Sequence, residues 1–500
     1  MLVRLASVFI RPAAAAPLRA ATAVGGSLRA LATAKTTETP TKGRPGRRPR
    51  NANAAAAKPA SAPKTRGRRA RSASGDAEKK PSLRIVRTRG TVMSKVEPLF
   101  KNYSLAEETP HPFCFPHLPH PLQWPLAFSF SRGMNARHRY FVANNETAQT
   151  IVDRIGLDRT DGKKYTVIEA YPGPGTLTRL MMRHPNVEKV IALEASDMFA
   201  AWIETIREDP SMADVKDKLA VLRASGYEWG TYEQLVDGGY LDHLRGRLPN
   251  FGPNSPPMDW DAESELVFVA QLPNSVHSEQ LFAQLVSASV ERYWLFKYGR
   301  MRLVFVCGEG IGSRAMAQPT DKNTRAKLGV TVQCVSSPSL ELTPEQLQPY
   351  GDHFYPQTPQ MGPRVLSRSA QIPHANIASG QNRQRLCMLA LEPLVKPLVD
   401  KREIDSLEFL LRSLFVRRAQ PIETALKNVA PGAGGILRKL APEHPDMKEH
   451  PERIVLPSTP VTELTNEQWA ALAYVFEKWP FRPRNLDDES GFGDDTITEE

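Results

Sequence analysis

The sequence contains little cysteine and no long apolar run. Its 500 residues include only four cysteines, none of which pairs with another in a C-x-x-C motif: Cys114, Cys307, Cys334 and Cys387. This number and spacing exclude a disulfide framework or a zinc ribbon and indicate a reducing compartment. The mean hydropathy is −0.39, and no run of about 18 apolar residues is present to form a membrane-spanning helix. We therefore predict a soluble or peripheral protein without a membrane partner.

Acidic residues are missing from the beginning of the chain. Residues 1–37 contain no Asp or Glu, whereas basic residues are spread among Ala, Leu, Val, Ser and Thr: Arg4, Arg11, Arg19, Arg29 and Lys35. An arginine-rich segment without acids is typical of a mitochondrial transit peptide, so we predict import into the mitochondrial matrix. The alternative interpretation is a disordered Ala-rich tail.

Residues 38–90 are also basic but lack the apolar residues that a folded core needs. Their Pro, Ala, Arg and Lys predict a disordered linker, with a non-specific phosphate-binding arm as the alternative. Residues 1–90 carry 21 Lys and Arg against 3 Asp and Glu, so within a total charge of +11 the remainder carries −7. A nucleic-acid surface in the folded part must therefore come from local basic patches.

Short β-branched runs alternate with helix-length stretches from residue 137 onward. The runs are 165–170, 189–194, 219–224, 265–270 and 302–307. They predict an α/β domain over residues 91–394, with a doubly wound parallel sheet and ligands at the carboxyl ends of its strands. Residues 328–334 and 386–391 are predicted as further strands, and Asn144-Asn145 is predicted to cap a helix.

The sequence changes character after Pro397. Apolar-rich stretches at residues 407–415, 436–440 and 469–476 predict a second, smaller helical domain over residues 395–485. Residues 486–500 contain seven Asp and Glu and predict a solvated acidic tail.

Two glycines follow the first predicted strand. The chain reads Tyr-Pro-Gly-Pro-Gly over residues 171–175, and a helical pattern follows. Gly173 and Gly175 allow a ligand to approach the backbone, and the helix N-terminus presents free N–H groups. Glu194, at the end of the second strand, is suited to accept hydrogen bonds from two ribose hydroxyls. These features predict an adenosine-containing ligand; the alternatives are a simple tight turn and a dinucleotide-dependent oxidoreductase.

Five short segments occur in the order and spacing of one known family. They are 140–145 (Tyr-Phe-Val-Ala-Asn-Asn), 169–175, Glu194, 271–274 (Gln-Leu-Pro-Asn) and 410–418. Together they resemble the ribosomal RNA adenine N6-dimethyltransferases, above all the mitochondrial transcription factor B branch of that family. The resemblance implies a Rossmann-like S-adenosylmethionine-dependent methyltransferase fold with a smaller C-terminal helical domain.

The resemblance also implies which residues would hold S-adenosylmethionine: Val142, Glu169, Gly173, Gly175, Glu194, Ser225 and Gln271. This chain departs from the active relatives at two of the surrounding positions. Tyr171 stands where they have glycine and would crowd the methionine end of the cofactor. Ser225 stands where an acidic residue would hold the adenine amine. We therefore expect S-adenosylmethionine, where it binds, to be a vestigial or structural ligand.

Gln271, Pro273 and Asn274 are the counterparts of the family's catalytic motif, Asn/Asp-x-Pro-aromatic. In that motif the polar residue accepts hydrogens from the target amine, and the aromatic ring stacks on the flipped base. Gln271 is one methylene longer than Asn, and a displacement of about 1 Å costs roughly 100-fold in rate. Asn274 has no ring to stack. We therefore treat these three residues as motif counterparts only, assign no catalytic residue and expect no efficient dimethylation.

Basic residues gather late in the chain. Residues 364–439 contain 13 Lys and Arg against 6 Asp and Glu. Those predicted to contact nucleic-acid phosphates are Arg383, Arg385, Arg412, Arg417, Arg418, Arg438 and Lys439; the alternative is a set of solvated helix faces. An aromatic run is predicted either to stack on unpaired bases or to pack in the core: Tyr293, Trp294, Phe296 and Tyr298. No metal is predicted, because the early histidines and Cys114 lack regular ligand spacing.

The resemblance implies two candidate functions. The leading hypothesis is a mitochondrial transcription initiation factor that confers promoter recognition and opening on the single-subunit mitochondrial RNA polymerase. Its partners would be that polymerase and promoter DNA, especially the unpaired non-template strand, and ribosomal RNA is a further candidate. The alternative is an active S-adenosylmethionine-dependent mitochondrial ribosomal RNA adenine N6-methyltransferase.

Overall fold

The computed structural model describes residues 113–128, 138–158, 161–247, 256–357, 384–483 and 486. All of these residues belong to one compact unit. The predicted transit peptide, the basic linker, Arg383 and nearly all of the predicted acidic tail lie outside the described residues. Among the described helices, none is long and apolar enough to cross a membrane.

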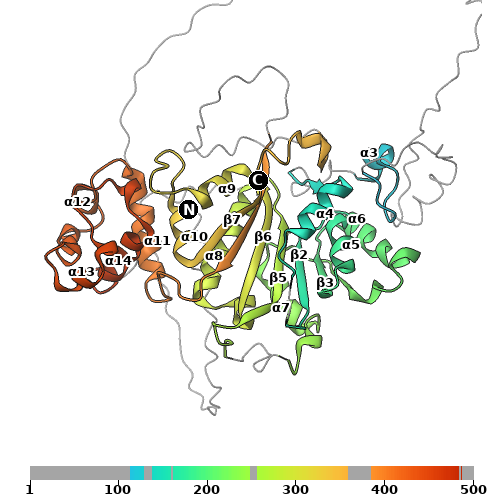
Figure 1. Cartoon of the computed structure of the whole chain (residues 1–500), viewed down its shortest axis with the longest axis horizontal. Coiled ribbons are helices and arrows are strands. Elements are labelled where there is room, and N and C mark those ends of the chain that lie inside the picture. The colour runs from blue at the N-terminus through green and yellow to red at the C-terminus, as the bar shows by residue number, and fades with distance from the viewer. Residues whose placement is uncertain are drawn as a thin grey trace, which may run out of the picture. The chain divides into compact units, whose positions relative to one another are not determined.

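Seven strands form one mixed sheet in the order β4-β3-β2-β5-β6-β9-β7 (Figure 1). The first five strands in this order, from β4 to β6, run parallel to one another, and β9 runs antiparallel to both of its neighbours. The bounds are β2 Tyr165–Ala170, β3 Val187–Leu193, β4 Leu219–Leu222, β5 Glu263–Gln271, β6 Arg300–Gly308, β7 Ser336–Leu342 and β9 Leu386–Pro393. The predicted doubly wound, Rossmann-like fold is confirmed, although the sheet is mixed rather than wholly parallel. The strand order reverses between β2 and β5, which is where such sheets bind ligands.

Alternate residues of the central strands feed two hydrophobic cores, one on each face of the sheet. In β2, Val167 packs into one core and Ile168 into the other. The first core is covered by α4 (Asn145–Asp153), α5 (Thr176–Arg183) and α6 (Asp197–Glu204). The second is covered by α7 (Trp229–Asp237), α8 (Val276–Glu291), α9 (Glu309–Met316) and α10 (Lys327–Val335). Burial on both faces explains why these strands read as continuous apolar runs.

One strand prediction is wrong and another is confirmed. Residues 328–334 lie in the helix α10, although Val330, Thr331 and Val332 favour strands. The tertiary environment overrides this preference, because the helix buries Val330, Val332 and Cys334 in the second core. Residues 386–391 form β9 as predicted. Strand β7 was not predicted, since it carries Pro338 and lies at the edge of the sheet, where proline is tolerated.

The C-terminal part of the chain is helical, as predicted. It comprises α11 (Ile404–Leu414), α12 (Ile422–Leu426), the 3₁₀ helix η10 (Ala433–Leu440), α13 (Pro445–Glu449) and α14 (Asn466–Glu477). These helices lie beyond α10 (Figure 1) and contact the rest of the unit chiefly through α10.

A buried arginine ties the helices to the sheet domain. Arg325, just before α10, is fully buried and donates hydrogen bonds to the Ala317 and Leu464 carbonyls and to the Asn466 Oδ1 atom, at 2.8, 3.2 and 2.9 Å. Burial lowers the pKa of its guanidinium. The Asn466 amide in turn donates to Gln333 in α10. The two parts therefore share a polar network inside an otherwise apolar contact.

We predict that Arg325→Met lowers the free energy of unfolding by about 2–5 kcal/mol, because it removes three hydrogen bonds, two of which join the helical part to the sheet domain. Urea unfolding monitored by circular dichroism measures the change. The exposed Arg417 provides the control, since Arg417→Met should change stability by less than about 0.5 kcal/mol. Equal effects of the two substitutions would contradict the structural role of Arg325.

Candidate functional site

The glycine loop connects β2 to α5 with three residues in the left-handed region. Tyr171, Gly173 and Gly175 have φ values of 57°, 62° and 88°. A Cβ atom added at Gly173 would lie 2.9 Å from the Phe141 Cβ atom, and one at Gly175 would lie 3.0 Å from the Ile206 side chain. Both glycines are therefore required by the backbone conformation and by protein side chains packed on the loop. Their presence does not by itself demand a ligand.

Glu194 forms a two-pronged ion pair with an arginine that sequence reasoning missed. The Arg139 Nη1 and Nη2 atoms donate to the Glu194 Oε1 and Oε2 atoms, each at 2.6 Å. Both side chains are buried, and the Ser196 N–H donates a further bond of 2.8 Å to Oε1. The carboxylate predicted to hold a ribose is thus occupied by groups of the chain itself. The only sequence signal for Arg139 is its place in a basic run directly before the 140–145 segment.

Tyr171 completes this cluster. The Arg139 guanidinium lies over its ring, 5.6 Å from the centroid. The phenol interacts with the Ser225 side chain, and burial raises the pKa of Tyr171 to about 12, so the hydroxyl stays neutral. The Ser225 Oγ atom also accepts the Tyr227 N–H at 3.2 Å. The structure therefore brings Glu194, Ser225 and Tyr171 together, with Arg139 between them and the α6 residue Phe199.

Gln271 is buried at the end of β5, and its amide is used inside the protein. Its Oε1 atom accepts the Val142 N–H at 2.9 Å, and its Nε2 atom donates to the Pro172 carbonyl at 3.3 Å. One side chain thus joins β5 to the 140–145 segment and to the glycine loop. Pro273 is buried, whereas Asn274 is exposed and its N–H donates to the His138 carbonyl. Gln271 is held as a cross-link between segments rather than as a free acceptor for a substrate amine.

Glu169 and Val142 both accept hydrogen bonds from threonines of α5, the helix that follows the glycine loop. The Thr178 hydroxyl donates to the Glu169 Oε2 atom at 2.5 Å, while the buried Oε1 atom has no hydrogen-bond partner among the described residues. Burial, aided by the negative charge of Glu194, raises the pKa of Glu169 to about 8. The Val142 carbonyl accepts the Thr176 hydroxyl at 2.7 Å, which fixes the start of α5.

The segment of residues 113–128, which is rich in proline, histidine and aromatic residues, packs on the glycine loop. His117 is buried, and its Nε2 atom lies 3.0 Å from the Pro174 carbonyl. Burial lowers the pKa of His117 to about 3, so the ring is neutral and donates to that carbonyl. Trp124 contacts Phe141 in the same core. No group of three or more His, Cys, Asp or Glu within the described ranges is placed to hold a metal.

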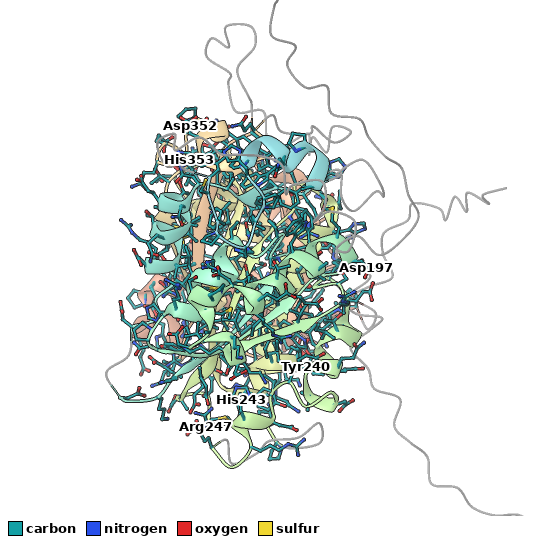
Figure 2. All side chains as sticks on the ribbon, turned by 90° about the vertical axis from the view of Figure 1, so that its right-hand side faces the viewer. Asp197, Tyr240, His243, Arg247, Asp352 and His353 are labelled. Atoms are coloured by element: carbon teal, nitrogen blue, oxygen red, sulfur yellow. The ribbon has the colours of Figure 1, made fainter. Side chains whose placement is uncertain are left out.

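Figure 2 labels residues that lie at two opposite ends of the sheet domain. Asp352 and His353 mark one end, and the His353 carbonyl accepts the Ala143 N–H from the 140–145 segment at 2.8 Å. His243 and Arg247 mark the opposite end, where His243 meets the Thr166 hydroxyl at the start of β2. The candidate pocket therefore lies at the carboxyl ends of the strands, as the sheet topology requires.

The residues as arranged do not fit S-adenosylmethionine. Arg139 and Ser196 already supply three hydrogen bonds to Glu194, so the carboxylate offers little to a ribose. Tyr171 occupies the first position of the loop. Ser225, which stands where the resemblance places an acidic residue, has no carboxylate and contacts Tyr171 and Tyr227. The residues that the resemblance assigns to the cofactor lie together here, but their polar groups bond to other groups of the chain.

The predicted phosphate-binding residues do not form a single surface element. Arg385, before β9, pairs with Glu309 at 2.9 Å and with Glu345. Arg412 in α11 donates to the Leu486 carbonyl, and Arg418 donates to the Asn323 carbonyl. The remaining described members are exposed in the helical part: Arg417, Arg438 and Lys439.

The aromatic run after α8 belongs mainly to the core. Phe296 and Tyr298 are buried, and Trp294 packs against Tyr232 with ring centroids 4.1 Å apart. Tyr293 alone among the four has a largely exposed side chain. The core interpretation thus holds for three of the four residues, which are not available for base stacking.

The chain is similar to known proteins over most of its length. Residues 134–444 match the family model described as ribosomal RNA adenine dimethylase. The chain is 20% identical to mitochondrial transcription factor 1 of Lachancea kluyveri over 353 residues, covering 69% of this chain and 92% of that protein. It is 21% identical to the mitochondrial dimethyladenosine transferase 1 of Vermamoeba vermiformis over 352 residues, covering 67% and 88%. Among solved structures, the 23S rRNA methyltransferase ErmE aligns with a TM-score of 0.38 and 14% identity, covering 67% of this chain and 98% of that one.

We predict that Glu169→Gln removes a pH dependence of stability. Because burial raises the pKa of Glu169 to about 8, the native state binds this proton more tightly than the unfolded chain. The contribution to stability is complete below the unfolded pKa of about 4.5 and is lost as the pH rises toward 8. Urea unfolding of both proteins at about pH 5.5 and pH 8 should show the variant gaining stability relative to the wild type at the higher pH. A constant difference between the two proteins would contradict the assignment.

We also predict that opening the cluster restores cofactor binding. Tyr171→Gly relieves a non-glycine residue at positive φ, and Arg139→Gln frees the Glu194 carboxylate. The double variant should bind S-adenosylmethionine at least about tenfold more tightly than the wild type in isothermal titration calorimetry, since it regains one or two charge-assisted hydrogen bonds. Adding Glu194→Gln should abolish the gain. Tight binding by the wild type would contradict the prediction.

Proposed function

Because this chain belongs to the ribosomal RNA adenine dimethylase family, we propose that it uses the family's scaffold as a mitochondrial transcription initiation factor. In this role it confers promoter recognition and opening on the single-subunit mitochondrial RNA polymerase in the mitochondrial matrix. Its nucleic-acid partner is promoter DNA, especially the unpaired non-template strand. Relatives named mitochondrial transcription factor 1, aligned over most of their length, support this proposal.

The observation that carries the proposal is the bidentate pair between Arg139 and Glu194. A methyltransferase needs that carboxylate for its cofactor, whereas here an arginine of the chain holds it at 2.6 Å through both oxygens. A bidentate guanidinium–carboxylate pair is among the strongest polar contacts in proteins, so the cofactor would have to displace it. A protein that binds nucleic acid without transferring a methyl group does not need the cofactor to displace Arg139 from Glu194.

The chemistry at the end of β5 supports the same conclusion. A catalytic acceptor must be free to meet the target amine, but both ends of the Gln271 amide are bonded to backbone groups. The exposed Asn274 offers no aromatic face to a flipped base. The motif therefore keeps its place at the end of β5 but lacks a free polar acceptor and an aromatic ring, two features of an adenine methyltransferase.

The second candidate function is a mitochondrial ribosomal RNA adenine N6-methyltransferase. The relative named mitochondrial dimethyladenosine transferase 1 favours it, at an identity similar to that of the transcription factors. On this hypothesis the Arg139–Glu194 pair opens when S-adenosylmethionine enters. Methylation of a small-subunit ribosomal RNA helix by the wild-type protein with labelled cofactor would then be observed.

We expect promoter-dependent transcription by the cognate mitochondrial RNA polymerase to require this protein on linear duplex DNA. Run-off transcripts from a duplex promoter should increase at least about tenfold on its addition, because strand separation costs several kcal/mol that binding of the unpaired strand offsets. On a template that is already melted, the polymerase should be active without it. This second template is the control for polymerase activity.

Lack of stimulation on duplex DNA, with the polymerase active on melted template, would contradict the initiation-factor proposal. Methylation of ribosomal RNA by the same preparation would then favour the enzyme. Because Gln271 joins three segments, Gln271→Ala would unsettle the fold as well as any chemistry. The wild-type protein, rather than this variant, should therefore be used for the decision.

A further inference from the structure

A cleft of about 550 Å³ opens in the C-terminal helices, away from the pocket at the ends of the strands. It is lined by the glycine-rich start of η10, by the basic side chains of Lys427 and Arg438, and by the acidic side chain of Glu423. Gly432 precedes η10 with a φ of 81°, and Gly434 and Gly435 follow within the first turn. None of these glycines belongs to the motifs that define the cofactor pocket.

Two of the glycines are not required by internal packing. A Cβ atom added at Gly435 would meet no protein atom within 4 Å, and one at Gly434 would make only an ordinary contact of 3.9 Å with Lys427. Neither residue has a positive φ. The Gly434 N–H also has no acceptor among the described residues. The cleft thus presents bare backbone and an unused donor, which is the arrangement that lets an anion approach closely.

The side chains around this backbone favour a negative ligand. Arg438 is exposed and forms no ion pair within the described part of the chain. Lys427 is paired with Glu423 one helical turn away at 3.2 Å, but both groups are more than half exposed, so the pair is weak. Lys439, next to Arg438, is exposed as well. A phosphate fits this combination of guanidinium, ammonium and backbone N–H groups.

An aromatic platform adjoins the cleft. A Cβ atom added at Gly432 would lie 3.6 Å from the Trp479 ring, which places this ring at the edge of the cleft. Phe481 packs edge-on against Trp479 with centroids 6.0 Å apart, yet 77% of its surface is exposed. Trp479 is anchored in turn by Phe476, which stacks on Phe409 inside the helical core. The exposed Phe481 ring is therefore supported by the partly buried Trp479, which packs in turn on the buried Phe476.

We propose that this cleft and platform form a subsite for single-stranded nucleic acid, with a backbone phosphate at Gly434 and Arg438 and an unpaired base stacked on Phe481. An exposed aromatic ring beside a phosphate site is the combination that binds unpaired strands without reading their sequence. The inference rests on the proposed function and deepens it, since an initiation factor must hold a separated strand. The subsite lies on residues outside the dimethylase motifs and does not depend on the cofactor pocket.

The test uses the full chain and fluorescence anisotropy with labelled oligothymidylate and oligouridylate of about ten nucleotides. Phe481→Ala should weaken binding by about 5- to 100-fold without changing its salt dependence, because it removes base stacking. Arg438→Gln should weaken binding and lower the slope of log affinity against log salt by about 0.7, because it removes one phosphate contact. The DNA and RNA probes report which strand the subsite prefers.

Matched variants separate the subsite from general effects. Phe481→Tyr retains a stacking ring and should retain affinity, whereas Phe481→Leu should resemble Phe481→Ala. Gly435→Ala fits the protein but fills the cleft, so it should weaken binding about fivefold or more while thermal stability is kept. Gly230→Ala, at another glycine with no atom within 4 Å, and Lys448→Gln, at an exposed lysine of α13, should leave binding unchanged.

The outcomes distinguish this inference from the proposed function. Wild-type stimulation of transcription together with unchanged strand binding by the Phe481, Arg438 and Gly435 variants would overturn the subsite and leave the function standing. A wild type that does not stimulate transcription, but whose strand binding falls in these variants, would retain the subsite and overturn the function. Variants that bind the strand normally but lose binding to the polymerase would show a protein-docking surface and also overturn the subsite.

Discussion

The buried pair between Arg139 and Glu194 determines what the carboxyl ends of the strands can do. A carboxylate at this position serves a nucleotide ribose only while its oxygens are free, and here both are bonded at 2.6 Å. Removing one partner of such a pair leaves an uncompensated buried charge, which typically costs about 3–5 kcal/mol. Burial therefore stabilises the ion pair against loss of either partner. At this point of the fold an internal ion pair stands where the resemblance predicts a contact to a ribose.

The neighbouring residues are arranged around the same pair. Tyr171 accepts a left-handed backbone conformation, which is unfavourable for a bulky residue, and its ring lies against the Arg139 guanidinium. Gln271 connects β5 to the two segments that flank the pocket. Loop, strand end and arginine thus stabilise one closed arrangement. The polar groups of the site are therefore bonded to one another within the chain.

The C-terminal helical part carries the described basic residues of the predicted nucleic-acid set that are exposed: Arg417, Arg438 and Lys439. Arg325 and Asn466 fix these helices to the sheet domain through buried hydrogen bonds, so the basic and aromatic side chains on them are presented by a rigid support. Of the basic residues that the sequence marks, Arg385 is neutralised by Glu309 and Glu345, whereas Arg438 stays exposed. Charge composition alone does not distinguish the paired Arg385 from the exposed Arg438, because pairing depends on which carboxylates lie nearby in the folded chain.

The sequence by itself determined the layered fold, the glycine loop and the family, because most β-branched runs, turn glycines and motif order can be read without knowing which distant residues meet. It predicted Asn144 as a helix cap, and the Asn144 side chain accepts two backbone N–H groups. Only the tertiary structure decided that 328–334 is a helix, that β9 runs antiparallel and that Arg139 meets Glu194 across 55 residues. Those outcomes depend on which distant groups share a buried volume, and burial makes an unpaired charge or a steric clash more costly than any local preference.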